Sequence, residues 1–128
     1  MLFKEFLSSL NEAETVKPKN RFALEILIRD TIEKEGNNCD LNFIDVSNVK
    51  DMSYMFYTSN FTGKNSPGMD KWNVSNVEKM DSMFERSEFA QDISGWEIDP
   101  SCSTEAMFAH CPLSNKHEFI PQCLLRRI

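Results

Sequence analysis

The residues of this chain that could do chemistry are four cysteines, two histidines and 20 acidic side chains. His110 and Cys111 are adjacent, and a thiol beside an imidazole is the pairing that nucleophilic catalysis uses. Cys111 nevertheless shares its place in an internal repeat with Ser59 and Ser87, which indicates a packed structural thiol. The sequence therefore predicts no catalytic residue, and we expect a protein that is not an enzyme.

Metal and cofactor sites are not expected either. The spacings between the cysteines match no zinc knuckle or finger, and the two histidines lie seven residues apart. The acidic residues are spread singly rather than gathered in a calcium-binding loop. The four glycines form no phosphate-binding cluster. We expect no metal and no cofactor.

Charge is distributed unevenly along the chain. The net charge is −6. Residues 40–113 carry 12 acidic and 5 basic side chains, whereas residues 114–128 carry 1 acidic and 3 basic side chains. Nucleic-acid phosphates would repel the acidic middle, so direct binding to nucleic acid is not expected. No apolar stretch approaches the ~18 residues that a membrane-spanning helix needs, and no signal peptide is visible, so the expected location is the cytoplasm.

An internal repeat organises the middle of the chain. Residues 46–56 and 74–84 share the pattern V-S-N-V-x-x-M-x-x-M-F at an offset of 28, and a degraded third copy occupies 98–108. A unit of about 24 residues cannot bury its apolar edge alone, so the copies must stack. Stacking brings four columns of apolar residues together: Leu41, Met69 and Ile93; Ile44, Trp72 and Trp96; Val46, Val74 and Ile98; Phe61, Phe89 and Leu113.

Local patterns predict the elements of each unit. The alternation from Trp72 to Val74 favours a short strand, and the spacing from Val77 to Phe84 favours a short helix, with Ser75 and Glu78 as a capping box. The segment 20–35 predicts a longer helix that begins after Asn20 and stops at Gly36. Residues 2–10 are a second amphipathic segment. Two alternatives stay open for it: it packs on the N-terminal cap, or it serves as a self-association helix.

Together these patterns predict an α+β fold: a short leucine-rich-repeat-like solenoid with a small parallel sheet, short helices and an N-terminal helical cap. We expect a single domain over 1–128, with the N-terminal cap at 1–39, three repeat units at 40–113 and a C-terminal cap at 114–128. The seven methionines recur at core positions of the units, so we assign most of them to packing rather than to a binding surface.

The repeat resembles the BspA-like leucine-rich repeats of bacterial surface proteins, in the branch that reads F-x-Q-D-I-S-x-W-N-V-S-N-V-x-x-M-x-x-M-F. Residues 89–96 and 73–84 together reproduce this unit almost letter for letter, and the likeness covers roughly residues 18–113. It implies a curved solenoid that binds other macromolecules, without catalytic residues. It also implies a cell-surface or secreted location if this chain is a fragment of a longer array.

The remaining functional candidates are side chains that the repeat does not require. They are expected to point outward, on the strand side or on the helical side, and we predict that they bind a protein partner: Phe43, Asp45, Tyr54, Tyr57, Asp70, Lys71, Asn73 and Glu97. The predicted function is non-catalytic protein–protein recognition. The alternative is a small acidic inhibitor in the bacterial or phage cytosol that covers the basic nucleic-acid-binding surface of an enzyme.

Overall fold

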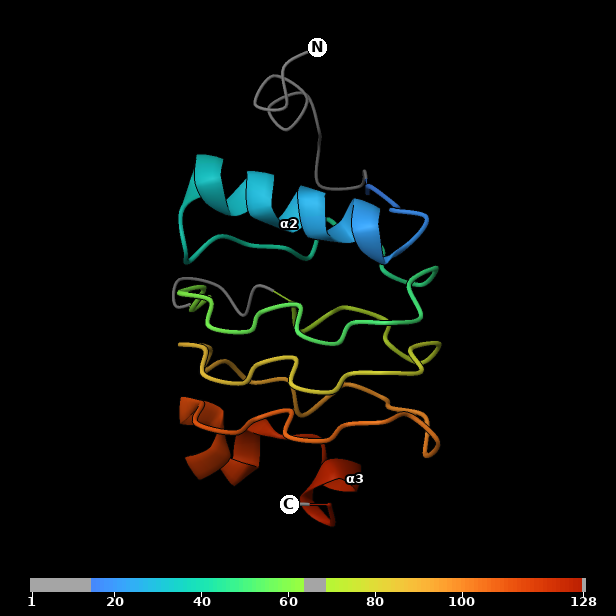
Figure 1. The fold of residues 1–128 in the computed structure, drawn as a ribbon, viewed down its shortest axis with the longest axis vertical. Helices are drawn as coiled ribbons and strands as arrows, with labels where there is room; N and C mark the ends of the chain where they lie inside the picture. Colours follow the sequence, from blue (N-terminus) through green and yellow to red (C-terminus); the bar gives the residue numbers. More distant parts are fainter. Residues whose placement is uncertain (1–14, 64–68, 128) are drawn as a thin grey trace.

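The computed structural model describes residues 15–63 and 69–127. Figure 1 shows that this part of the chain forms three stacked layers, here defined as residues 41–63, 69–91 and 93–111. A long helix closes one end of the stack and short helical segments close the other. The amphipathic segment at 2–10, with its predicted role in self-association, lies outside the described residues.

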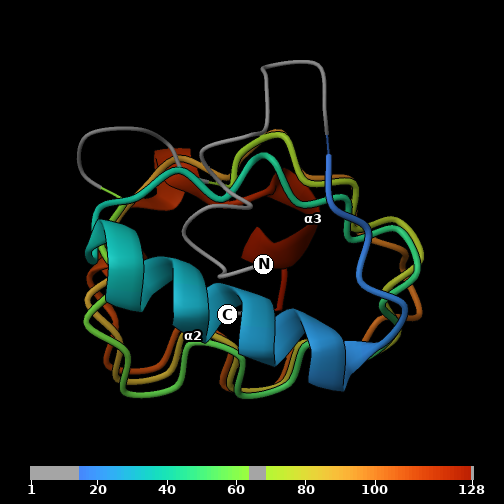
Figure 2. The same cartoon turned by 90° about the horizontal axis from the view of Figure 1, so that it is seen from above.

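The closing helix is α2 (Arg21–Glu35), which confirms the helix predicted after Asn20. The Asn20 side chain accepts a hydrogen bond from the Ala23 N–H at 2.9 Å, and Gly36 ends the helix at a φ of 94°. The buried side of α2 lies against the first layer, and Figure 2 shows the helix crossing that layer. Its buried residues are Leu24, Leu27, Ile28 and Thr31. Helix α2 therefore covers the end of the stack at the first layer (Figure 2).

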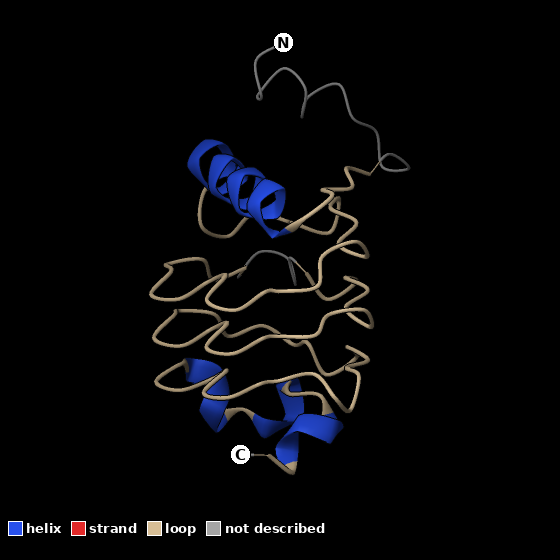
Figure 3. Ribbon diagram, turned by 45° about the vertical axis from the view of Figure 1, so that its right-hand side comes forward, coloured by secondary structure: helices blue, strands red, loops and turns tan. Residues whose placement is uncertain are grey.

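The predicted α+β solenoid with a small parallel sheet is wrong. Residues 15–63 and 69–127 form no strand, and Figure 3 shows helices at the two ends with loops and turns between them. Only isolated parallel bridges occur in this part of the chain, which join Val16 to Ile44 and link Lys79 to both Asp51 and Ser103. The short helix expected between Val77 and Phe84 is also absent.

Consecutive β-turns take the place of both predicted elements. In the first layer, the N–H groups of Met55, Tyr57 and Ser59 donate to the carbonyls three residues earlier, at 3.0–3.2 Å. Tyr54 and Thr58 have φ values of 61° and 56° at the third position of their turns, which is the geometry of a type II turn. Ser82, Arg86, Ala106 and His110 repeat this geometry in the other two layers.

The turns are joined from layer to layer by a ladder of backbone hydrogen bonds. Alternate N–H groups of one layer donate to carbonyls of the next at 2.7–3.0 Å. The first-layer donors are Met52, Tyr54, Phe56 and Thr58, and the second-layer donors are Met80, Ser82, Phe84 and Arg86. This turn ladder satisfies the backbone groups that a sheet would have satisfied.

Short polar side chains form the corners of each layer. Asp45, Asn73 and Asp99 each accept a hydrogen bond from the N–H of the serine two residues later, at 2.8–3.1 Å. Such local side-chain bonds compete with strand pairing and favour turns. The Ser75 N–H is engaged in this way, so the predicted capping box between Ser75 and Glu78 does not form.

Columns of apolar side chains form the core. Two aromatic pairs that were predicted to share a column do stack, namely Phe61 with Phe89, at a centroid distance of 5.9 Å, and Trp72 with Trp96. The Phe84 ring stacks between Phe56 and Phe108, at centroid distances of 5.5 and 5.9 Å. Trp72 and Trp96 stack at 6.3 Å, and their indole N–H groups donate to the buried carbonyls of Leu41 and Met69 at 2.9 Å. Each indole therefore ties its own layer to the preceding one.

The third layer departs from the repeat at its corner. The Cys102 N–H closes a turn on the Asp99 carbonyl, as Val77 does on Val74, so Cys102 rather than Ser101 takes the buried place of Val77. Below this layer lie η1 (Pro112–Asn115), η2 (His117–Phe119) and α3 (Gln122–Leu125). The Phe119 carbonyl accepts the Ile93 N–H at 3.0 Å, which attaches the C-terminal end to the third layer.

Candidate functional site

The predicted partner-binding residues lie on two opposite sides of the stack. In Figure 2, residues 52–58 of the first layer follow one long edge of the ring and residues 41–46 follow the other. Tyr54 and Tyr57 belong to the first of these edges. The second edge and its equivalents in the other layers carry Phe43, Asp45, Asp70, Lys71, Asn73 and Glu97. The structure therefore offers two candidate surfaces rather than one.

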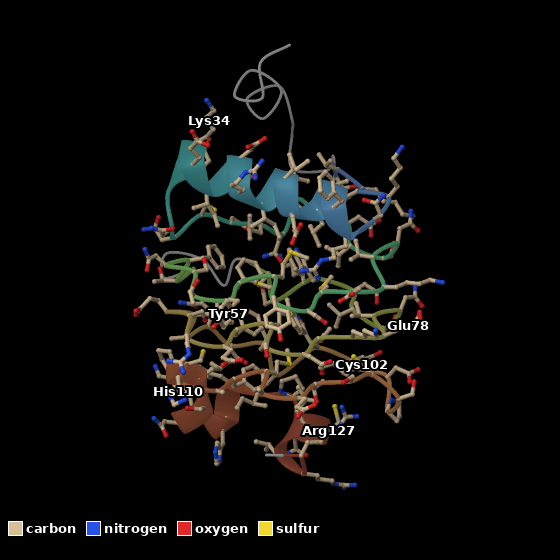
Figure 4. All side chains as sticks on the ribbon, in the orientation of Figure 1. Lys34, Tyr57, Glu78, Cys102, His110 and Arg127 are labelled. Carbon is tan, nitrogen blue, oxygen red and sulfur yellow. The ribbon has the colours of Figure 1, made fainter. Side chains whose placement is uncertain are left out.

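Tyr54 and Tyr57 form the first candidate, here named the tyrosine surface. Their side chains are 56% and 41% exposed, and their rings meet edge to face at a centroid distance of 5.5 Å. Figure 4 places Tyr57 near the middle of the turn side of the molecule. The equivalent residues of the third layer are Ala106 and Ala109, so the turns themselves do not require aromatic side chains here.

A groove lies beside the tyrosine surface, between α2 and the first layer. Its volume is about 460 Å³, and its wall includes Met55 and Phe56 from the turn and Ile28 and Ile32 from the helix. Glu25 and Arg29 add opposite charges at the same place. Two exposed aromatic rings next to an apolar groove with charged margins have the composition of a protein-binding surface.

The second candidate, here named the acidic surface, has more contacts with the rest of the fold. It consists of the residues on the second edge: Phe43, Asp45, Asp70, Lys71, Asn73 and Glu97. Phe43 is half-buried and packs against the core, rather than pointing freely outward as the sequence suggested. The Asn42 side chain donates to the Asp70 carboxylate at 2.9 Å and accepts the Lys71 N–H at 3.0 Å. Lys71, Asn73 and Glu97 are exposed. Several polar atoms of this surface therefore already have structural partners.

Two of the corner carboxylates have altered proton affinity. Hydrogen bonds from the side chain and backbone of Ser47 lower the pKa of Asp45, and those from Ser101 lower the pKa of Asp99. Partial burial acts to raise the pKa of Asp51, but hydrogen bonds from Ser53 and the charge of Arg21 lower it overall. These carboxylates stay ionised at neutral pH and serve as hydrogen-bond acceptors.

The cysteine and histidine that could have formed a nucleophilic pair are placed differently. Cys111 is buried, with its thiol donating to the Phe89 carbonyl at 3.2 Å, and burial raises its pKa. His110 is exposed on the turn side. Burial likewise raises the pKa values of Cys39 and Cys102 to about 11. These thiols are protonated at neutral pH, which suits packing rather than nucleophilic attack.

Sequence reasoning missed a larger cavity below the third layer, here named the C-terminal groove. It has a volume of about 790 Å³ and is lined by residues 102–109 together with Ser114, His117, Leu125 and Arg127. Figure 4 shows Arg127 beneath the third layer, close to Cys102. Its only sequence signal is the basic charge of residues 114–128, which carry no recognisable motif.

The described residues hold no cluster of three or more His, Cys, Asp or Glu side chains that could bind a metal ion. No helix within 15–63 or 69–127 has the length and apolar character needed to span a membrane. Comparison with curated proteins and with solved structures gives no match. A family described as "Mycoplasma protein of unknown function, DUF285" matches residues 28–118, which is more than half of the chain. The chain therefore belongs to the DUF285 family.

Proposed function

We propose that this protein is a non-catalytic recognition module that binds another protein through the tyrosine surface. The observation that carries this proposal is the exposed contact pair of Tyr54 and Tyr57, which the fold does not require at these positions. Tyrosine supplies a large contact area with only two side-chain torsions to order, so it is enriched at protein interfaces. The adjoining groove between α2 and the first layer would receive an apolar side chain of the partner.

The resemblance to BspA-like repeats also supports a binding function. The motif at residues 73–84 and 89–96 resembles that of BspA-like leucine-rich repeats, and this resemblance implies binding to other macromolecules. We propose that this chain is a BspA-like member of its family in motif and in binding role, and that its partner is a protein. A cytoplasmic location stays a prediction, as does a cell-surface or secreted location if this chain is a fragment of a longer array.

A second candidate function rests on charge. Residues 40–113 carry a net charge of −7, from 12 acidic and 5 basic side chains. An acidic surface of this kind could cover the basic nucleic-acid-binding site of an enzyme, which is the inhibitor hypothesis. Asp45, Asp70 and Glu97 would supply part of that charge. The hydrogen bonds from Ser47 and Asn42 would hold the Asp45 and Asp70 carboxylates in fixed positions on that surface.

A comparison of two variants in affinity capture separates these functions. The double variant Tyr54→Ala/Tyr57→Ala carries the alanines that the third layer has at the same turn positions, so the fold should be retained. The triple variant Asp45→Asn/Asp70→Asn/Glu97→Gln removes charge from the acidic surface. Partners retained by the wild type from the native cell lysate are identified, and their binding to each variant is measured over a range of salt concentrations.

Recognition through the tyrosine surface predicts that the tyrosine variant loses the partner and that salt has little effect. Charge mimicry predicts that the triple variant loses a basic partner and that binding weakens steeply with salt. Phe43→Ala serves as a further test of apolar contact on the acidic surface. A hydrolase activity that disappears in Cys111→Ala would contradict both functions.

A further inference from the structure

The turn ladder has an open edge at its last layer. In each of the first two layers, four backbone N–H groups donate to carbonyls of the layer below. The equivalent third-layer groups belong to Thr104, Ala106, Phe108 and His110, and none of them finds an acceptor among residues 15–63 and 69–127. The carbonyls between them are already used, because Ser103, Glu105, Met107 and Ala109 accept from the second layer. The third layer thus presents unused donors and no unused acceptors along this edge.

The C-terminal end covers only part of this edge. The Arg127 guanidinium donates to the carbonyls of Cys102 and Pro100 at 2.6 and 2.8 Å and to the Thr104 hydroxyl at 3.0 Å. These contacts fix the beginning of the edge. Thr104, Ala106 and Phe108, whose N–H groups are unused, instead line the C-terminal groove. A row of backbone donors along a groove is a template for a second peptide backbone.

The walls of the groove specify what such a peptide should carry. Met107 and Phe108 are 2% and 4% exposed and form its buried apolar floor, and Leu125 also lines the groove. His117 and Arg127 lie on its rim, against one acidic residue, Glu105. The whole segment 114–128 carries 3 basic and 1 acidic side chains, in contrast to the acidic layers above. This end of the molecule therefore favours an acidic segment.

We infer that the C-terminal groove binds a peptide segment of another protein that continues the turn ladder by one layer. The segment would adopt the turned conformation of residues 79–85, so that its carbonyls accept the unused N–H groups of the third layer. It would carry acidic side chains towards His117 and Arg127 and an apolar side chain towards the floor. This interaction does not depend on the tyrosine surface, which lies on a different layer.

A capped synthetic peptide with the sequence of residues 77–88 is a suitable probe. The same segment already accepts the ladder bonds of the first layer, and it carries four acidic and two basic side chains. It is added in excess to the whole ¹⁵N-labelled protein, and backbone amide signals are followed. We expect saturable shifts and slower hydrogen exchange at the amides of Thr104, Ala106 and Phe108, with no saturable change at Tyr54 or Tyr57.

Two charge variants test the orientation of the peptide. His117→Glu places a negative charge in the groove and should weaken binding of the acidic peptide about two- to fivefold, which is the range for one exposed charge contact. Lys71→Glu, on the acidic surface of the second layer, changes the net charge by more than His117→Glu does and should leave binding unchanged. Equal weakening by both variants would show a net-charge effect and would overturn the assignment of the rim.

Other outcomes would also overturn the inference. An excess of peptide that shifts no third-layer amide would show that the open edge does not accept a backbone. A free protein that dimerises in sedimentation, with these amides protected only at high concentration, would show that the occupant is a second copy of the chain. Loss of the shifts in Tyr54→Ala/Tyr57→Ala would place the peptide on the tyrosine surface instead.

Discussion

At the scale of single residues, the unusual feature is the left-handed backbone of six non-glycine residues within 15–63 and 69–127. Their φ values lie between 54° and 61°, and they occupy two equivalent places in each layer: Tyr54, Thr58, Ser82, Arg86, Ala106 and His110. This conformation costs about 1–2 kcal/mol for a residue with a β-carbon. The ladder bonds of neighbouring layers must offset that cost, so these positions hold strain that substitution can release.

Ala106 and Ala109 provide a matched test of this strain. Ala106 has a φ of 54°, whereas Ala109, in the same turn region, has no positive φ. Ala106→Gly should leave stability unchanged or raise it by up to about 1 kcal/mol, because glycine adopts this conformation without strain. Ala109→Gly should lower stability by about 0.5–1 kcal/mol through backbone entropy. Urea unfolding of both variants measures the difference, and equal losses would contradict the account.

The corner carboxylates make stability depend on acid. The folded-state pKa values of Asp45 and Asp99 are lowered, so the unfolded chain binds protons more readily than the folded one. Their contribution is present above the unfolded-state pKa of about 3.9 and is lost as the pH falls through the lower folded-state value. The unfolding free energy should therefore decline below about pH 4.

Asparagine at these corners isolates the effect. Asp45→Asn/Asp99→Asn keeps an oxygen acceptor, as Asn73 does at the corner of the second layer, but it cannot titrate. Chemical unfolding between neutral and acidic pH should show a shallower decline for this variant than for the wild type. Parallel pH profiles would mean that these two carboxylates do not carry the acid sensitivity.

At the scale of elements, the sequence predicted which residues stack but not how the backbone connects them. Val77, Met80 and Met83 are spaced by three, and both a helix and a series of turns with i to i+3 hydrogen bonds produce that spacing. Trp72 and Val74 alternate as in a strand, yet the Asn73 side chain between them bonds to the Ser75 N–H and bends the chain. Periodicity alone could not distinguish these alternatives, because the competing bonds are local and polar.

The helix that was predicted correctly carried signals of a different kind. Asn20 and Gly36 mark the two ends of α2 through a side-chain acceptor and a positive φ, and neither signal depends on contacts with the rest of the fold. The tyrosine surface was also accessible from sequence, because comparison of the copies showed aromatic residues where the second copy has Ser82 and Glu85 and the third has alanine. The unpaired donors of the third layer have no sequence signal, since every residue type except proline has an N–H group.

The indole donors predict how strongly two layers are tied together. Trp72→Phe keeps an aromatic ring in the stack but leaves the buried Leu41 carbonyl without the donor that it has at 2.9 Å. The Leu41 carbonyl keeps the hydrogen bond from the Ile44 N–H at 3.1 Å, so the variant loses one hydrogen bond rather than leaving an unpaired acceptor. Thermal and urea unfolding should show a loss of about 0.5–1.5 kcal/mol, with some addition for lost contact area. Tyr57→Phe removes only an exposed hydroxyl and is the control. Equal losses in the two variants would contradict a structural role for the indole bond.

At the scale of the whole molecule, the two ends of the stack differ. α2 covers the first layer, and Arg21 joins the helix to that layer through the Asp51 carbonyl at 3.3 Å and its carboxylate at 3.4 Å. The other end leaves a row of donors and a groove of about 790 Å³. The end with α2 is therefore closed by a helix, and the capacity to bind a further backbone lies at the other end.

This asymmetry predicts that damage to α2 weakens the entire stack. Leu24 is fully buried on the inner side of α2, and Leu24→Ala should lower the free energy of unfolding by about 2–5 kcal/mol. Trp72 and Trp96 report from the second and third layers, so their fluorescence should follow the same transition as circular dichroism. Ile26→Ala, at a position 37% exposed on the same helix, should cost far less. Separate transitions for helix and tryptophans would mean that the layers do not unfold together.

The central structural claim is that backbone turns, joined in a ladder with one open edge, hold the layers together. Residue-resolved amide hydrogen exchange of the free protein tests it most directly. We expect slow exchange at the ladder donors of the first two layers, such as Phe56 and Phe84, and fast exchange at their third-layer equivalents Ala106 and Phe108. Equally slow exchange in all three layers, or equally fast exchange in all three, would contradict the claim.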